Sequence, residues 1–129
     1  VTHFISSMGT TGTIVGTSKF LKEKNPSIQI IGVQPEEGSQ IPGIRKWPKE
    51  YLPSIFEDKN IDSIRLVSQI DAEETARILA KKEGIFSGAS TGGALYVALE
   101  IAKKTPKAVI VSIACDRGDR YLSTGIFPA

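Results

Sequence analysis

The sequence predicts an α/β fold: an open, mostly parallel twisted sheet with helices on both faces. Three observations support this fold class. Apolar, β-branched runs of strand length alternate with segments of helical periodicity, most connections between them are short, and two glycine-rich loops each lead into a helix. Strand–helix–strand order with short connections is typical of parallel βαβ units. Because ligands of open α/β sheets bind beyond the carboxyl ends of the strands, we expect a site there.

The first half of the chain is predicted to form one βαβ unit followed by a long loop. The expected elements are a buried strand at 2–7, a Gly/Thr loop at 8–13, a helix at 14–24, a buried strand at 28–33 and a loop at 34–60. The helix has a basic end, which suits its dipole, and Asn25-Pro26 ends it. The loop is rich in proline and also contains aromatic residues, so we expect it to be ordered, with one helical turn.

The second half is predicted to contain a strand, two helices and a final strand. The expected elements are a strand at 61–68, a helix from 71 to about 83, a helix from the glycine-rich segment 88–93 to about 104, and a strand at 108–114. Residues 71–74 have the pattern of a capping box, and Gly84 is expected to be the C-cap of the first helix. The last strand is an uninterrupted apolar run, as in strands buried within a parallel sheet.

Composition limits the class of protein. The 129 residues suffice for one domain, and 40% hydrophobic and 23% charged residues are ordinary values for a globular chain. The net charge of +2 is scattered, which argues against nucleic-acid binding, and no apolar run approaches the roughly 18 residues of a membrane span. With one cysteine and one histidine, neither an internal disulfide nor a metal site is expected, and a cytoplasmic location fits best. Because Val1 already lies within a strand pattern, we expect a piece of a longer protein.

The loop at 8–13 could bind an anion. Gly9 and Gly12 let a ligand approach the backbone, the helix N-terminus favours negative charge, and the hydroxyls of Thr10, Thr11 and Thr13 can donate to phosphate oxygens. The pattern is neither a Walker A loop, which needs Gly-Lys-Ser/Thr, nor the G-x-G-x-x-G dinucleotide fingerprint. It is equally consistent with a tight strand-to-helix turn that has an ordinary threonine N-cap.

Other candidate site residues each have a structural alternative. Ser90 lies where a helix begins, so it is either an N-cap or a hydrogen-bond partner for a ligand. Arg45, Lys46 and Trp47 are either surface charges beside a loop-anchoring Trp or part of a lid for an anionic substrate. Cys115 ends the last strand, where it is either small apolar filler or part of the site.

Several motifs together are more specific than any one of them. Residues 6–13 (SSMGTTGT) resemble the phosphate loop of fold-type II pyridoxal-phosphate enzymes, and residues 84–94 (GIFSGASTGGA) resemble the segment whose serine faces the pyridine nitrogen. Residues 116–125 (DRGDRYLSTG) are similar to the end of cysteine synthases. Residues 34–39 and 41–48 are similar to the B-type cysteine synthases, which are O-acetylserine sulfhydrylases. The resemblance covers nearly all of this chain but less than half of a family member.

The resemblance implies a cofactor, a reaction and two groups of site residues. The residues that bind pyridoxal 5'-phosphate would be Gly9, Thr10, Thr11, Gly12 and Thr13 at the phosphate and Ser90 at the pyridine nitrogen. The residues that bind the substrate would be Arg45, Trp47 and Cys115. The implied reaction belongs to cysteine biosynthesis: sulfide or thiosulfate replaces the β-substituent of O-acetylserine or O-phosphoserine, giving cysteine or S-sulfocysteine. An arginine suits the anionic sulfonate end of thiosulfate.

The resemblance also implies what this chain lacks. The family's Schiff-base lysine and its carboxylate-binding loop lie N-terminal to the matched segments, and no lysine of this chain stands in such a motif, so no catalytic residue is named. We expect the chain to be the C-terminal, cofactor-phosphate-binding part of a two-domain, homodimeric enzyme, inactive without its N-terminal portion. Thr91 stands where the family often has a second serine.

Two alternatives remain. Another pyridoxal-phosphate enzyme, of the cystathionine β-synthase or serine dehydratase type, would share the first two motifs, but the Arg-Lys-Trp segment speaks against it. A non-catalytic module that binds a different phosphate ligand would use the same loop. The module hypothesis predicts that nucleotides or sugar phosphates bind without any N-terminal portion.

Overall fold

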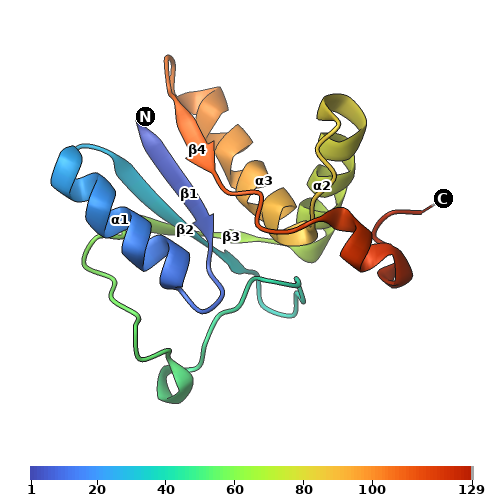
Figure 1. The fold of residues 1–129 in the computed structure, drawn as a ribbon, viewed down its shortest axis with the longest axis horizontal. Helices are drawn as coiled ribbons and strands as arrows, with labels where there is room; N and C mark the ends of the chain where they lie inside the picture. The colour runs from blue at the N-terminus through green and yellow to red at the C-terminus, as the bar shows by residue number, and fades with distance from the viewer. Residues whose placement is uncertain (129) are drawn as a thin grey trace.

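A computed structural model describes residues 1–128, and its centre is a four-stranded parallel sheet with the strand order β3-β2-β1-β4 (Figure 1). The elements in chain order are β1 (His3–Ser7), α1 (Gly12–Lys24), β2 (Gln29–Pro35), the 3-10 helix η1 (Lys49–Tyr51), β3 (Ser63–Val67), α2 (Gln69–Glu83), α3 (Ala89–Lys104), β4 (Ile110–Ser112) and the 3-10 helix η2 (Gly118–Thr124). No helix within the described range 1–128 has both the length and the apolarity that crossing a bilayer requires.

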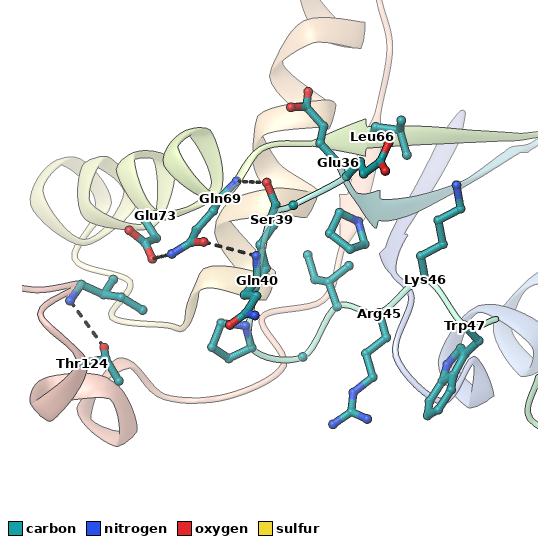
Figure 2. A pocket seen from close by; sticks show the side chains of 18 of the residues that line it. Glu36, Ser39, Gln40, Arg45, Lys46, Trp47, Leu66, Gln69, Glu73 and Thr124 are labelled. Atoms are coloured by element: carbon teal, nitrogen blue, oxygen red, sulfur yellow. Dashed lines mark hydrogen bonds between the residues drawn. The ribbon is translucent and has the colours of Figure 1, made fainter. Parts of the chain in front are cut away.

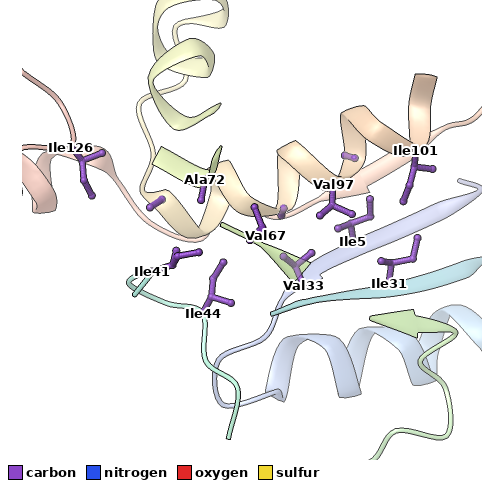
Figure 3. Close-up of a cluster of buried hydrophobic side chains, with 13 residues drawn as sticks. Ile5, Ile31, Val33, Ile41, Ile44, Val67, Ala72, Val97, Ile101 and Ile126 are labelled. Carbon is purple, nitrogen blue, oxygen red and sulfur yellow. The ribbon is translucent and has the colours of Figure 1, made fainter. Parts of the chain in front are cut away.

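Helices cover both faces of the sheet, so the predicted fold class is confirmed. In β1, Phe4 and Ile5 are both buried and point to opposite faces, as successive strand residues must. Phe4 belongs to a cluster under α1, and Ile5 belongs to the larger cluster under α3 (Figure 3). In β2, Ile30 and Ile31 divide between the same two clusters.

The order of connections in the sheet reverses between β1 and β4. The chain runs from β1 through α1 to β2 and then to β3, and it returns through α2 and α3 to reach β4 on the other side of β1. The chain therefore leaves β1 towards one face of the sheet, while α3 and the segment after β4 lie towards the other (Figure 1). Such a reversal of strand order is where open α/β sheets bind ligands, at the carboxyl ends of the strands.

Helix α2 begins two residues earlier than the sequence pattern indicated. The expected capping box at 71–74 is wrong as a helix start, because Ser68 is the N-cap and its Oγ accepts a 3.0 Å hydrogen bond from the backbone N–H of Asp71. The Ser68 hydroxyl also donates to the Asp71 carboxylate at 2.9 Å. A serine followed three residues later by an acidic residue is itself a capping signal. The expected C-cap is confirmed, since Gly84 has a φ of 70°.

The final strand is shorter and less buried than predicted. The run 108–114 was expected to be a strand buried on both faces, but β4 spans only Ile110–Ser112 and lies at the edge of the sheet. Val109, Val111 and Ile113 are 55%, 38% and 44% exposed. Val111 pairs with Phe4 and so shares the face that α1 covers, but α1 packs over β1 and β2. The uninterrupted apolar run is therefore only partly covered within residues 1–128.

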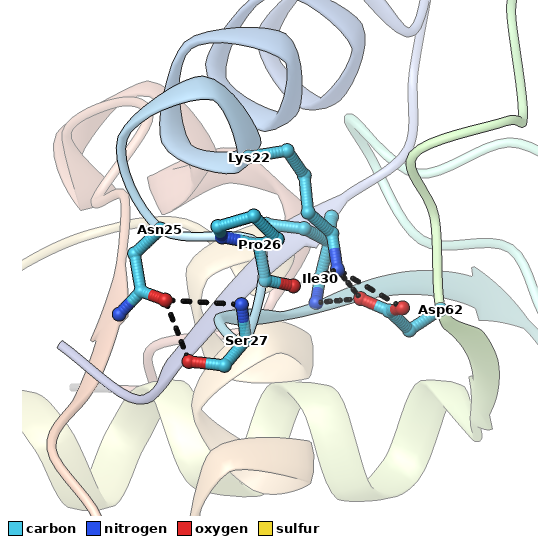
Figure 4. Close-up of polar contacts among 6 residues, drawn as sticks. All are labelled: Lys22, Asn25, Pro26, Ser27, Ile30 and Asp62. Atoms are coloured by element: carbon cyan, nitrogen blue, oxygen red, sulfur yellow. Dashed lines mark hydrogen bonds and ion pairs between the residues drawn. The ribbon is translucent and has the colours of Figure 1, made fainter.

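The long loop between β2 and β3 is ordered and has one helical turn, η1, as predicted. Ile41 and Ile44 anchor it in the core, with exposed fractions of only 5% and 3%. At its far end, the Asp62 carboxylate accepts hydrogen bonds from the Ile30 N–H at 2.7 Å and from Lys22 Nζ (Figure 4). Partial burial alone would raise the pKa of Asp62, but these two hydrogen bonds outweigh it and lower the pKa. Both ends of the loop are thus fixed to the sheet.

Candidate functional site

The loop between β1 and α1 has an unusual backbone and a buried hydroxyl without a partner. Thr11 is the N-cap residue of α1, with a left-handed φ of 74°, and its backbone carbonyl accepts the Val15 N–H at 3.0 Å. Its side chain makes no capping bond, and its Oγ1 has no hydrogen-bond partner among residues 1–128 although Thr11 is only 4% exposed. The alternative of an ordinary threonine N-cap is therefore wrong. A hydroxyl beside the positive end of a helix suits an anion.

The other residues of this loop form its open side. Thr10, Gly12 and Thr13 are exposed, and Gly9 is half-buried. Gly12 is the first residue of α1, so its backbone N–H and the next ones are among the four that no helical carbonyl can accept. The loop therefore offers free backbone donors and hydroxyls at the carboxyl end of β1.

The segment that follows Gly43 lies against this loop. The Arg45 N–H donates to the Met8 carbonyl at 2.7 Å, and Trp47 Nε1 donates to the Gly9 carbonyl at 2.6 Å. Trp47 thus anchors the long loop between β2 and β3 to the 9–13 loop, as one of the two interpretations of this residue predicted. The Arg45 guanidinium lies 5.3 Å from the centre of the Trp47 ring, a cation–π distance, and it forms no ion pair within residues 1–128.

Ser90 lies at the start of α3 but does not cap it. The N-cap is Gly88, so Ser90 is the second helical residue and the N-cap interpretation of Ser90 is wrong. Ser90 is 3% exposed, and its backbone carbonyl accepts the hydroxyl of Ser7 at 2.7 Å. A Cβ on Gly43 would lie 3.1 Å from Ser90 Oγ, which places the Gly43 backbone directly beside this hydroxyl. Ser90 therefore lies next to both the end of β1 and the long loop.

Cys115 follows β4 and lies beside the first turn of α3. Its backbone N–H donates to Thr91 Oγ1 at 3.3 Å, and its Sγ donates to the Ile113 carbonyl at 3.4 Å. Burial, and then the negative charge of Asp116, raise the pKa of the Cys115 thiol, although a hydrogen bond with Ser90 acts in the opposite direction. The thiol is therefore protonated at neutral pH and suits contact with a ligand better than nucleophilic attack.

The structure brings the predicted site residues to the carboxyl ends of β1 and β4. Hydrogen bonds link the phosphate-loop candidates to Trp47, and β1 to Ser90 through Ser7. Sequence reasoning did not name three residues that contact Ser90 or its neighbour Gly88: Ser7, Gly43 and Asp116. Ser7 and Asp116 stand in segments whose motifs were recognised, whereas the approach of Gly43 depends on how the long loop folds back, which no local pattern shows.

A large hollow among the described residues does not coincide with this cluster. It is an open cleft of about 1190 Å³, lined mainly by the loop residues 35–48 together with residues of α2 and the C-terminal segment (Figure 2). Arg45 and Trp47 line it, whereas the 9–13 loop, Ser90 and Cys115 do not. The hydrogen-bonded cluster at the strand ends, and not the size of the hollow, therefore defines the candidate site.

Comparison with known proteins identifies the family. The model of the family described as "Pyridoxal-phosphate dependent enzyme" matches residues 1–116. The chain belongs to the pyridoxal-phosphate-dependent enzymes. Within this family it is 60% identical to "Cysteine synthase B" of Escherichia coli and 44% identical to "Cysteine synthase" of Aquifex aeolicus, over 98% of this chain in both cases. It spans only 42% and 40% of the lengths of these two relatives.

Solved structures of pyridoxal-phosphate enzymes share the fold. O-ureido-L-serine synthase matches with a TM-score of 0.89 and 30% identity, over 98% of this chain and 43% of that protein. The O-acetylserine-dependent cystathionine β-synthase of Helicobacter pylori matches with a TM-score of 0.83 and 38% identity, over 98% of this chain and 44% of that protein. The predicted fold-type II family is thus confirmed, and the family's cofactor, pyridoxal phosphate, fits the residues present. Thr11 supplies a buried, unpartnered hydroxyl and α1 supplies free N–H donors, which together suit a phosphate group.

Proposed function

We propose that this chain is the part of a cysteine synthase that binds the phosphate and the ring of pyridoxal phosphate. The whole protein would replace the β-substituent of O-acetylserine or O-phosphoserine with sulfide or thiosulfate in cysteine biosynthesis. The observation that carries the proposal is the buried, unpartnered hydroxyl of Thr11. Its glycine–threonine loop lies with Ser90 at the carboxyl end of β1. The 60% identity to "Cysteine synthase B" of Escherichia coli supports the choice of reaction.

Different residues of the proposed site would hold the phosphate and the ring of the cofactor. Gly9, Thr10, Thr11, Gly12 and Thr13 would bind its phosphate, and the Ser90 hydroxyl would contact its pyridine nitrogen. When bound, pyridoxal phosphate supplies an electron-withdrawing ring that stabilises negative charge at the α-carbon of an amino acid. A neutral hydroxyl, unlike a carboxylate, does not hold a proton on the ring nitrogen. Ser90 would therefore leave the bound ring a moderate electron sink, which would be enough for the loss of a group such as acetate from the β-carbon.

The substrate side of the site would lie under the long loop. Arg45, Trp47 and Cys115 are proposed to line the space for the incoming nucleophile. The guanidinium of Arg45 has no carboxylate partner within residues 1–128 and is therefore free to meet an anion. Because a guanidinium can bind two oxygens at once, it favours a sulfonate-bearing nucleophile such as thiosulfate over sulfide.

The proposed activity requires more than this chain. No lysine here stands in the motif that anchors the cofactor in the family, and the chain spans 42% of the length of "Cysteine synthase B" of Escherichia coli. We therefore propose that an N-terminal portion supplies the lysine and the loop that binds the substrate carboxylate, and that the complete enzyme is a homodimer.

A reconstitution experiment tests the proposal. The chain is mixed with pyridoxal phosphate, with and without the N-terminal portion, and the visible absorbance of protein-bound cofactor is recorded together with cysteine formation. Absorbance and activity that appear only with the N-terminal portion would support a cysteine synthase. If nucleotides or sugar phosphates bind to this chain alone, and no absorbance appears with the N-terminal portion present, the non-catalytic phosphate-binding module is the better description.

Thr11 offers a specific version of this test. Thr11→Val removes the hydroxyl but keeps the shape of the side chain, so we expect the Kd for pyridoxal phosphate to rise about tenfold. The same change should stabilise the cofactor-free protein, because it removes a buried hydroxyl without a partner. Thr11→Ser keeps the hydroxyl and is the matched control. Cofactor affinity is measured by fluorescence titration. Equal affinity of the unchanged protein, Thr11→Val and Thr11→Ser would show that this hydroxyl does not bind the phosphate.

A further inference from the structure

The segment after β4 forms hydrogen bonds with the start of α3 at two points, one on either side of Ser90. The backbone N–H of Gly88 donates to Asp116 Oδ1 at 3.1 Å. The backbone N–H of Cys115 donates to Thr91 Oγ1 at 3.3 Å. One contact precedes Ser90 by two residues and the other follows it directly, so the position of Ser90 depends on this segment.

Asp116 is itself held in place from its other side. The Tyr121 hydroxyl donates a hydrogen bond to the second carboxylate oxygen, so both oxygens of Asp116 have a partner. This hydrogen bond, followed by burial and the charge of Asp116, raises the pKa of Tyr121, which keeps the phenol protonated as the donor. Tyr121 lies in η2, so it couples the C-terminal segment to the start of α3.

Only glycine fits between these groups. A Cβ on Gly88 would lie 2.5 Å from Asp116 Oδ1 and 2.6 Å from the Tyr121 ring, distances that real atoms do not adopt. Because Gly88 is the N-cap of α3 and has no side chain, it cannot supply a capping acceptor of its own. Asp116 brings a carboxylate from a different element to this helix start, where the helix dipole favours a negative charge.

We propose that Asp116, fixed by Tyr121, is a positioning residue that sets Ser90 against the pyridine ring of the bound cofactor. It acts through Gly88 and the first turn of α3, without contact with the cofactor. The inference rests on the proposed function, because it concerns the same site. It extends that function to two residues outside the phosphate loop and the substrate pocket, and it gives the motif at 116–125 a physical role.

The test compares variants of the complete protein, with the N-terminal portion present. Asp116→Ala removes both acceptors, Asp116→Asn keeps an oxygen for the Gly88 N–H, and Tyr121→Phe removes only the hydroxyl. Asp119→Ala is the matched control, because Asp119 is in the same segment but pairs with Arg117 at the surface. The measurements are the Kd for pyridoxal phosphate, the fluorescence maximum of the bound ring and the ³¹P resonance of the bound phosphate.

We expect Asp116→Ala to raise the Kd for pyridoxal phosphate about tenfold or more and to shift the ring fluorescence. The ³¹P resonance should not change, because the phosphate loop lies at the end of β1 and not at α3. Asp116→Asn should restore the Kd to within about threefold of the unchanged protein, since its amide oxygen can still accept the Gly88 N–H. Tyr121→Phe should give a Kd between those of Asp116→Asn and Asp116→Ala. Asp119→Ala should leave the Kd and the ring fluorescence unchanged.

Three results would contradict these expectations, and each one leads to a different conclusion. If Asp116→Ala and Tyr121→Phe bind the cofactor with unchanged affinity and fluorescence, the inference is wrong and the proposed function stands. If fluorescence and ³¹P resonance change together, the role of Asp116 is general stability and the inference is also wrong. If the unchanged protein binds no pyridoxal phosphate, the proposed function itself is wrong and the inference falls with it. Tyr121→Phe keeps the ring packed on Gly88, so it tests the inference even where Asp116→Ala fails to fold.

Discussion

Two buried hydroxyls of this chain, those of Thr11 and Ser87, have no hydrogen-bond partner within residues 1–128. Each such group lowers the free energy of unfolding by about 1–3 kcal/mol relative to a satisfied or an apolar one. Ser87 lies one residue before the N-cap of α3, whereas Thr11 lies in a strained left-handed conformation at the start of α1. Strain and an unused donor at the same residue are typical of a site shaped for a ligand.

At the scale of single residues, Arg45 is predicted to select the nucleophile. Arg45→Ala should raise the KM for thiosulfate about tenfold and change the KM for sulfide by less than about twofold, because only thiosulfate presents a sulfonate to the guanidinium. Lys46→Ala is the matched control, since the neighbouring Lys46 points in the opposite direction (Figure 2). Steady-state kinetics of the complete enzyme measure both constants. Equal losses with both nucleophiles would rule out this role.

Sequence reasoning named most of the residues that the structure brings together at the candidate site, but it did not predict the contacts between them. The loop at 9–13, Ser90 and Cys115 could be predicted because each follows or precedes a recognisable strand or helix. One of the two interpretations of Ser90, an N-cap, is wrong because the N-cap is Gly88, whose backbone N–H donates to Asp116, 28 residues away in the sequence. Contacts of this kind depend on tertiary packing, which periodicity and motif spacing do not contain.

At the scale of elements, α2 and α3 pack so closely that their contact depends on one glycine. A Cβ on Gly92 would lie 2.0 Å from the Ala72 carbonyl oxygen and 2.8 Å from the Ala76 nitrogen, both backbone atoms that cannot move independently of α2. Ala72 and Ala76 are fully buried in this contact. Small residues on both helices therefore let α3 lie against α2 and against the sheet at once.

This packing predicts opposite effects for two glycine-to-alanine changes. Gly92→Ala should lower the free energy of unfolding by about 3 kcal/mol, because α2 and α3 must move apart. Gly16→Ala should raise it by roughly 0.5–1 kcal/mol, because Gly16 lies within α1, has open space around it, and alanine favours the helix. Denaturant unfolding of both variants beside the unchanged protein checks the pair. A neutral Gly92→Ala would contradict the close contact between α2 and α3.

At the scale of the whole molecule, the sheet places the site well but leaves the outer edge of β4 uncovered within residues 1–128. The reversal of strand order brings the ends of β1 and β4 together, and α1 and α3 approach this point from opposite faces. Within residues 1–128 the outer edge of β4 has no neighbouring strand, and the apolar side chains around it are exposed. Exposed edges with apolar side chains promote association with further strands, and natural proteins usually cover them.

The N-terminal portion that we propose is expected to cover this edge. If that portion completes the domain, the backbone amides of residues 109–113 should exchange with deuterium more slowly when it is present. The amides of β2 are the internal control, because β2 already has a hydrogen-bonded strand on each side and its exchange should change little. Binding of an apolar dye to the chain should fall in parallel, since Val109, Val111 and Ile113 would lose their exposure. Unchanged exchange at 109–113 in a reconstituted, active enzyme would show that the N-terminal portion completes the active site without covering this edge.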